Sequence, residues 1–144
     1  MEIQPFPFLK CNKFYNLSDM SSPIKIIDSE IAYMEFYDNY VISSIKEDII
    51  FDIEELHYMI NIMDEQFPDK NFGYIANRIY SYNMNPVTYP VSSIHERLSA
   101  MAIVCYSEVS RKTALFEKDF FKKPFEVFDE IEEAKKWLQE ILKK

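Results

Sequence analysis

Imidazole side chains are the first candidates for chemistry in this sequence, because histidine serves both as a general base and as a metal ligand near neutral pH. The chain has two histidines, His57 and His95, which fall in separate predicted helices. Neither belongs to an HxxxH or HExxH motif or to a cluster with cysteine, the spacings that bring metal ligands together. We expect both histidines to be structural or exposed, and we predict no metal site.

Ser92 and Ser93 lie close to His95, but they do not indicate a nucleophile. A nucleophilic serine needs a base at hydrogen-bond distance and an oxyanion hole, and the sequence has no GxSxG elbow. Ser93 followed three residues later by Glu96 is typical of a helix capping box. The carboxylates are plentiful but scattered, as on a solvated face, so they indicate no general acid and base. We therefore predict no catalytic residue and a protein that is not an enzyme.

The composition excludes further classes of function. The 144 residues include a single glycine, Gly73, so the glycine-rich turns of a P-loop or a dinucleotide-binding fold are absent. There are 16 Lys and Arg against 24 Asp and Glu, a net charge of −8, whereas nucleic-acid binding depends on cations that neutralise phosphates. We predict no cofactor and no nucleic-acid partner.

Cysteine usage and hydropathy indicate the compartment. Cys11 and Cys105 are too few for a disulfide framework, and Cys105 lies in an apolar run, where a small buried thiol is ordinary. No stretch approaches the ~18 apolar residues of a membrane span, and the N-terminus has no basic start followed by an apolar run. We expect a cytoplasmic protein without a membrane span.

The elements that must position any site begin after an irregular start. Residues 1–22 show no clean period but carry several aromatic side chains, so we expect an arm that packs on the domain or on a second copy. We assign residues 23–144 to one domain.

Runs rich in β-branched and aromatic residues at 24–28, 31–37 and 40–46 predict three strands. The pair Asp38 and Asn39 between the last two runs predicts a hairpin, because both residues tolerate a positive φ.

A helix and a strand follow. Asp52 with Glu55 predicts a capping box, and apolar residues at helical spacing continue to Pro68. Residues 72–76 predict a buried strand. In the irregular segment 77–90, Asn85 and Pro86 are suited to start a helix, but Pro90 interrupts it, so we expect a distorted or broken helix. Its predicted apolar face contains Val87, Val91, Ile94 and Leu98.

The last third predicts two more strands and two more helices. Residues 99–106 predict a buried strand, and residues 107–121 predict a helix with Val109, Phe116 and Phe120 on one stripe. Phe125–Phe128 predicts a short strand. Asp129 with Glu132 resembles a capping box before a closing helix that carries Ile131, Ala134, Leu138, Ile141 and Leu142.

Strands alternating with helices of this length imply parallel pairing through right-handed crossovers. The sequence therefore predicts an α/β fold, with N-terminal hairpin strands followed by βαβαβα and a mixed, mostly parallel sheet. In this order of elements, and in the strand-to-helix segments at 72–77, 100–107 and 125–138, residues 24–142 resemble the STAS domain superfamily, the fold of bacterial anti-sigma-factor antagonists. The chain is most similar to small stand-alone STAS-like proteins of bacteria.

The resemblance implies a binding or regulatory role. In the antagonists, a phosphorylatable serine in an Asp-Ser-Ser/Thr-Gly turn switches binding to a kinase partner. The corresponding turn here, residues 76–82, contains Ser81 but neither the Asp nor the Gly. We expect the fold without that phosphoserine switch. The same broad fold also occurs in lipid-binding domains.

The predicted sheet topology indicates where a site would lie, because ligands of open parallel sheets bind beyond the carboxyl ends of the strands. This places one rim of polar and aromatic side chains together: Asn77, Arg78, Tyr80, Ser81, Tyr82, Asn83, Tyr106, Ser107 and Arg111. With its arginines and hydroxyls, such a rim suits an anion, a phosphopeptide or a partner's acidic loop. The plain alternative is that Tyr80 and Tyr82 cover the sheet edge and that Arg78 pairs with a surface carboxylate.

We therefore expect a non-enzymatic domain that binds another protein or itself, as a homodimer, since the chain is rich in Phe, Tyr and Met. The alternative is a carrier or sensor of a small apolar or anionic ligand, lipid-like or a nucleotide. Its pocket would lie between the sheet and the helix at 52–67 or the helix at 107–121.

Overall fold

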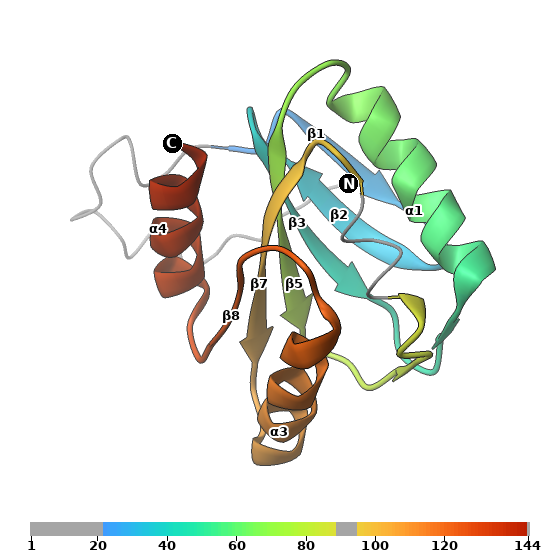
Figure 1. Ribbon diagram of the computed structural model, residues 1–144. Coiled ribbons are helices and arrows are strands. Elements are labelled where there is room, and N and C mark those ends of the chain that lie inside the picture. The colour runs from blue at the N-terminus through green and yellow to red at the C-terminus, as the bar shows by residue number, and fades with distance from the viewer. Residues whose placement is uncertain (1–21, 89–94, 144) are drawn as a thin grey trace, which may run out of the picture.

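A six-stranded sheet forms the centre of the molecule, in the order β1-β2-β3-β5-β7-β8 (Figure 1). The computed structural model describes residues 22–88 and 95–143. The six strands are Lys25–Asp28 (β1), Ala32–Phe36 (β2), Tyr40–Ile45 (β3), Phe72–Arg78 (β5), Leu98–Cys105 (β7) and Phe125–Phe128 (β8). The pairs β1–β2 and β2–β3 are antiparallel, and the other three pairs are parallel. The predicted α/β class is confirmed; the predicted arm, except Ser22, lies outside the described residues.

The N-terminal hairpin turns at Asp38 and Asn39, as predicted, although neither residue adopts the positive φ on which that prediction rests. Tyr37 N donates to Tyr40 O across the Asp38-Asn39 turn, at 2.8 Å. Side chains alternate along β2, so that Ala32, Met34 and Phe36 are at most 2% exposed while the intervening residues face the other way.

Helix α1 spans Ile53–Gln66 and precedes β5 in the chain. It lies at the right of Figure 1, beside β1 and β2. The predicted capping box is present: Asp52 Oδ1 accepts from Ile53 N at 2.8 Å, and Glu55 Oε1 accepts from Asp52 N at 2.9 Å. The inward residues of α1 are Leu56, Met59, Ile62 and Met63.

Two short strands, Ile50–Phe51 (β4) and Asn83–Met84 (β6), form a separate parallel pair that the sequence did not predict. Strands of two residues have no alternation to recognise. Asn85 Oδ1 accepts from Val87 N at 3.1 Å, as a cap would, but most of the expected helix falls at residues 89–94, outside the described residues. Leu98 lies in β7 and not on a helix face, which corrects that part of the prediction.

Helix α3 spans Glu108–Glu117 and continues as a 3-10 turn, Lys118–Phe120 (η3). Two of the three residues of its predicted apolar stripe do not face the core, since Val109 is 75% and Phe116 60% exposed, whereas Phe120 is partly buried and packs against the core. The buried residues of α3 are Ala114 and Glu117. In this orientation Glu117 forms an ion pair with Arg78 of β5 inside the molecule.

The closing helix α4 spans Ile131–Leu142, as predicted, but its capping box is absent. The N-cap is Glu130, whose side chain makes no capping hydrogen bond. Asp129 instead accepts from Arg111 at 2.7 Å, which takes its carboxylate away from the helix.

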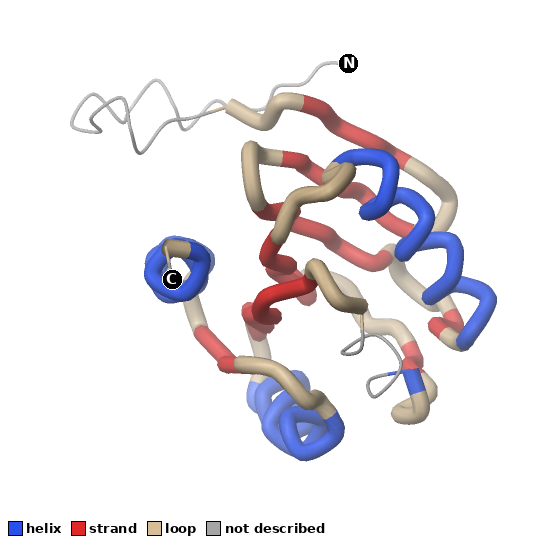
Figure 2. Tube along the Cα trace, turned by 45° about the horizontal axis from the view of Figure 1, so that its top comes forward, coloured by secondary structure: helices blue, strands red, loops and turns tan. Residues whose placement is uncertain are grey.

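Helices cover the two faces of the sheet unequally. Residues of α1 and α3 belong to one core cluster, whereas residues of α4 belong to the other, and Figure 2 shows α1 and α4 on opposite sides of the strands. Gly73 permits the close approach of α4 to β5, because a Cβ there would lie 2.6 Å from a Leu138 methyl carbon. None of the helices in the described residues is both long and apolar enough to cross a bilayer.

Candidate functional site

The predicted rim surrounds a depression at the carboxyl ends of β5 and β7. We call it the rim depression; its volume is about 580 Å³. It is lined by seven of the nine predicted residues, together with residues of β6 and α3. The seven are Arg78, Tyr80, Ser81, Tyr82, Asn83, Tyr106 and Ser107.

The other two predicted residues lie outside this lining. Asn77 Oδ1 accepts from the Tyr106 hydroxyl at 2.6 Å, which holds the tyrosine at the edge of the depression. Arg111 turns toward the β8–α4 connection and pairs with Asp129 at 2.7 Å.

Arg78 forms the floor of the rim depression instead of an exposed edge. Its Nη1 lies 2.7 Å from Glu117 Oε1, and the two side chains are only 9% and 8% exposed. The guanidinium also lies 5.8 Å from the centre of the Tyr82 ring, within the range of a cation–π contact. The alternative of a carboxylate partner for Arg78 is therefore the correct one, although the pair is buried and not at the surface.

Sequence reasoning missed Glu117, yet a signal for a buried partner was present. Residues Tyr74, Ala76 and Arg78 alternate on one face of a buried strand, so the Arg78 side chain had to point into the core with a counter-charge. Helical periodicity alone does not select Glu117 among the carboxylates of α3.

Exposed apolar side chains gather at the rim depression. Ile79, Tyr80, Tyr106 and Val109 line it, and each is about half exposed or more. Hydroxyls of Ser81, Ser107, Ser110 and Thr113 lie among them. The only charged residues in its described lining are Arg78 and Glu117, which form a pair with each other. The surface that results is apolar and rich in hydroxyls, without net charge.

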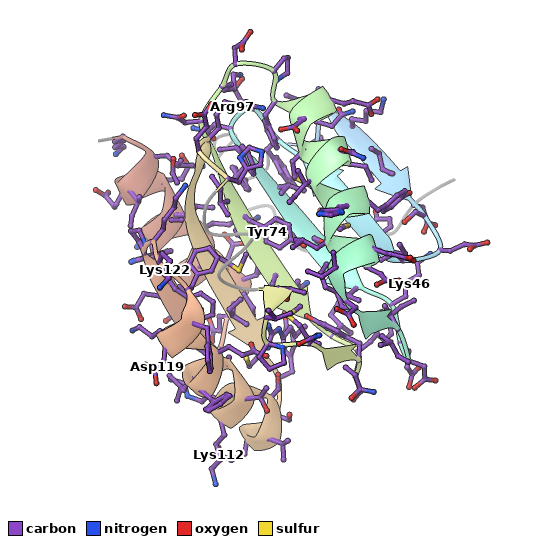
Figure 3. All side chains as sticks on the ribbon, turned by 45° about the vertical axis from the view of Figure 1, so that its right-hand side comes forward. Lys46, Tyr74, Arg97, Lys112, Asp119 and Lys122 are labelled. Atoms are coloured by element: carbon purple, nitrogen blue, oxygen red, sulfur yellow. The ribbon has the colours of Figure 1, made fainter. Side chains whose placement is uncertain are left out.

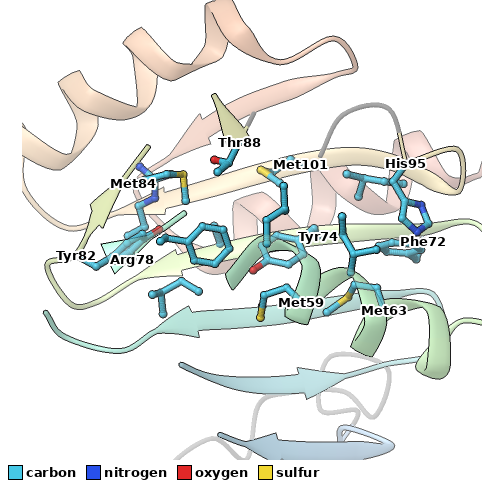
Figure 4. A pocket seen from close by; sticks show the side chains of 16 residues that line it. Met59, Met63, Phe72, Tyr74, Arg78, Tyr82, Met84, Thr88, His95 and Met101 are labelled. Atoms are coloured by element: carbon cyan, nitrogen blue, oxygen red, sulfur yellow. The ribbon is translucent and has the colours of Figure 1, made fainter. Parts of the chain in front are cut away.

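A second, apolar cavity lies beneath α1, between the helix and the strands β3, β5 and β7 (Figure 4). Its volume is about 70 Å³, and four methionines line it: Met59, Met63, Met84 and Met101. Tyr74 lines the cavity inside the molecule, whereas Lys46 and Lys112 lie at the periphery of the molecule (Figure 3). The predicted position of a pocket between helix 52–67 and the sheet corresponds to this cavity.

Few polar groups reach the apolar cavity. Tyr74, Tyr82 and Thr88 supply hydroxyls, and Arg78 closes one end. Burial raises the pKa of Tyr74 above its usual value; it also raises the pKa of Tyr82, an effect that the Arg78 guanidinium partly offsets. Both phenols therefore stay neutral and can donate hydrogen bonds at physiological pH.

The opposite end of the cavity is closed by His95. Its Nε2 lies 2.8 Å from Asp64 Oδ1, which also accepts from Arg97 Nη2 at 2.9 Å, so α1 is tied to the start of β7. The His95 ring meets Phe72 edge to face at 5.4 Å. This arrangement fits the structural role expected for His95. Across residues 22–88 and 95–143, no three His, Cys, Asp or Glu side chains are grouped so as to hold a metal ion.

Comparisons with known proteins support the fold. No family model and no curated protein matches the chain. Among solved structures, it is similar to a Shewanella loihica PV-4 protein described as an uncharacterized member of the DUF3478 family with a SpoIIAA-like fold. The identity is 12%, the TM-score is 0.52, and the match covers 83% of this chain and 98% of that one. The chain thus has a SpoIIAA-like, that is STAS-like, fold, as its resemblance implied.

Proposed function

We propose that this protein is a non-enzymatic binding domain that acts by docking a partner protein at the rim depression. The observation that carries the proposal is the gathering of Ile79, Tyr80, Tyr106 and Val109, all largely exposed, around one hollow. Exposed aromatic and apolar side chains around a concave surface mark sites of association, whereas isolated ones do not.

The charges of the depression favour an uncharged apolar segment of the partner over an acidic one. Arg78 pairs with Glu117, and Arg111 pairs with Asp129, so each arginine of the predicted rim already faces a carboxylate. A phosphate or an acidic loop would have to compete with those carboxylates. Serine and threonine hydroxyls around the hollow suit backbone carbonyls of a docked segment. Binding should then depend little on salt.

Ser81 supports a docking role without the phosphoserine switch. Its side chain is exposed, and its carbonyl accepts from Asp48 N at 2.9 Å. The residues that follow form β6, so the hydroxyl does not stand at the first turn of a helix, where a phosphate gains from backbone amides and the helix dipole.

Site-specific photocrosslinking tests the docking proposal. A photoreactive phenylalanine analogue at Val109, inside the depression, should give a partner adduct in cells. The same analogue at Leu115 should not, because Leu115 is exposed on the same helix but does not line the hollow. An adduct with a second copy would identify the partner as this protein. Equal adducts from both positions, or none from position 109, would reject the site.

The purified partner then tests the expected chemistry. Val109→Glu should weaken its binding by more than about tenfold, since a charge would enter an apolar contact. Leu115→Glu is the matched control and should have no effect. Affinity should be nearly equal at low and high salt, and a steep loss of affinity at high salt would contradict an uncharged contact.

A second candidate function, the binding of a small ligand, is favoured by the apolar cavity. Methionine side chains are unbranched and adapt to occupants of different shape. The cavity volume of about 70 Å³ is below the ~300–1,000 Å³ of ordinary ligand pockets, so a ligand must be small or must displace these methionines. Because Arg78 is already neutralised by Glu117, we infer a neutral molecule with one hydrogen-bonding group, and not an anion.

A matched pair of probes, one neutral and one charged, distinguishes a neutral ligand from an anion. 1-Hexanol should raise the melting temperature in a saturable way, since a ligand that binds only the folded state stabilises it. Hexanoate, of similar length but charged, should not. Equal shifts would reject the charge argument, and no shift from hexanol, together with bare polypeptide in native mass spectrometry, would count against the carrier function.

A further inference from the structure

The outward face of β2 carries a group of aromatic and acidic side chains that neither proposed site uses. Tyr33 and Glu35 stand at alternate positions of β2, and Tyr37 follows two residues later, directly after the strand; the three side chains lie on the same side, since both tyrosines bond to Glu35. The Tyr33 hydroxyl donates to Glu35 Oε2 and the Tyr37 hydroxyl to Glu35 Oε1, each at 3.2 Å. Tyr40 of β3 stacks on Tyr37, with ring centres 4.6 Å apart and planes at 5°. We call these four residues the tyrosine–glutamate patch.

Described helices leave part of this sheet face open. The core residues of α4, Ala134 and Leu138, pack with residues of β5 and β7 in a cluster that includes Tyr40 and against which Tyr37 packs, whereas Tyr33 and Glu35 lie outside it. Helices α1 and α3 contribute to the opposite face. Figure 2 shows the strands β1, β2 and β3 extending away from α4. Tyr33, Glu35 and Tyr37 are accordingly half-buried.

Within the described residues, the charge of Glu35 has no ion-pair partner, in contrast to Asp28, Asp38 and Asp64. Each of its oxygens accepts one phenol hydroxyl, and an ionised carboxylate has about four acceptor positions in all, so further donors can be accommodated. Burial raises the pKa of Tyr37 and raises that of Tyr40 to about 12, and the nearby Glu35 charge acts in the same direction. The rings therefore remain neutral, with their hydroxyls protonated.

A carboxylate set among neutral tyrosine rings has the chemistry that recognises a cation. The ring faces attract an ammonium group through their quadrupole, and Glu35 adds a charge-assisted hydrogen bond. Neither an anion nor a purely apolar group would be stabilised by both the ring faces and the Glu35 carboxylate. The net charge of −8 attracts basic partners further.

We propose that the tyrosine–glutamate patch binds a lysine side chain on a basic segment of a partner protein, with the ammonium group at Glu35 and the aliphatic stem along the tyrosine rings. This second binding surface is independent of the rim depression, which contains no unpaired carboxylate in its described lining.

Nuclear magnetic resonance with tyrosine-labelled full-length protein tests the proposal directly. The probe is N-acetyl-lysine methylamide, and its neutral counterpart is N-acetyl-norleucine methylamide, which has the same stem without the charge. The lysine probe should shift the ring signals of Tyr33, Tyr37 and Tyr40 in a saturable way. The norleucine probe should not. No saturable shift, or equal shifts with both probes, would overturn the proposal.

Variants separate recognition from a purely structural network. Glu35→Gln removes the charge but retains hydrogen-bonding capacity, and it should lower the affinity for the lysine probe by about fivefold or more. Glu54→Gln, an exposed carboxylate on α1, is the control and should leave affinity unchanged. Unaltered binding in Glu35→Gln, or an equal loss in Glu54→Gln, would refute a specific site.

A second pair of variants keeps the test decisive if Glu35→Gln fails to fold. Tyr33→Phe retains the ring face, so its affinity for the lysine probe should be within about twofold of that of the wild type. Tyr33→Leu has no ring, and its affinity should fall by roughly two- to fivefold. Equal affinities of the Phe and Leu variants would reject the cation–π contribution.

Discussion

The buried ion pair between Arg78 and Glu117 allows the sharpest quantitative prediction. Both side chains are under 10% exposed, and their charged atoms are 2.7 Å apart, so solvent screens the pair little. Replacing Glu117 by Leu removes a carboxylate that pairs with the buried guanidinium, and breaking such a pair costs about 3–5 kcal/mol. Against a total stability of ~5–15 kcal/mol, this is a large fraction. The melting temperature should fall by roughly 10–20 °C.

A double-mutant cycle measures the pair. Arg78→Met and Glu117→Leu should each destabilise the protein strongly, while the double variant should lie much closer to the wild type, because apolar residues of similar volume replace a buried pair at little cost. Free energies of unfolding from urea titrations give the four corners of the cycle. Arg111→Met is the matched control: it breaks an exposed pair with Asp129 and should cost under ~1 kcal/mol.

Two outcomes would refute this reasoning. If Glu117→Leu costs no more than Arg111→Met, the Arg78–Glu117 pair is not buried in solution. If the losses of the two single variants simply add in the double variant, the side chains do not interact.

Two further predictions concern the sheet. The pKa of Tyr40 is raised to about 12 from an ordinary value near 10, so its stabilising contribution is complete below about pH 10 and is lost as pH rises toward 12. Urea titrations at about pH 9 and about pH 11 should show that the free energy of unfolding falls more in the wild type than in Tyr40→Phe. An equal fall in both proteins would contradict burial of this phenol. Gly73→Ala should destabilise the protein by ~1–3 kcal/mol, because the new Cβ would lie 2.6 Å from Leu138, and unchanged unfolding in urea would show that α4 moves away freely.

Much of the fold was predictable because strong local signals coincide with long elements. The capping box at Asp52 and the alternation of Ala32, Met34 and Phe36 both appear in the structure as predicted. Local signals failed where a distant partner competed for the same atoms. Asp129 has the spacing of a cap, yet Arg111 draws its carboxylate away.

The candidate site was predicted in position but not in its electrostatics. Seven of the nine expected residues line the rim depression, since the carboxyl ends of neighbouring parallel strands meet at one edge of a sheet. The partner of Arg78 could not be assigned, because which carboxylate faces it depends on the rotation of α3, a helix that lies about 40 residues later in the chain.

The sequence by itself determined the class of this protein: an α/β fold without glycine-rich phosphate loops and acidic overall, as composition and periodicity are local properties. Only the tertiary structure decided what its surfaces can bind. It buried Arg78 against Glu117 and turned Val109 outward on α3. It also set Glu35 between Tyr33 and Tyr37, with Tyr40 stacked beside them. The Arg78–Glu117 pair joins elements that are distant in sequence, whereas Glu35 and its tyrosines belong to one hairpin. In both places the energy of the charge depends on the partner and the burial that packing gives it.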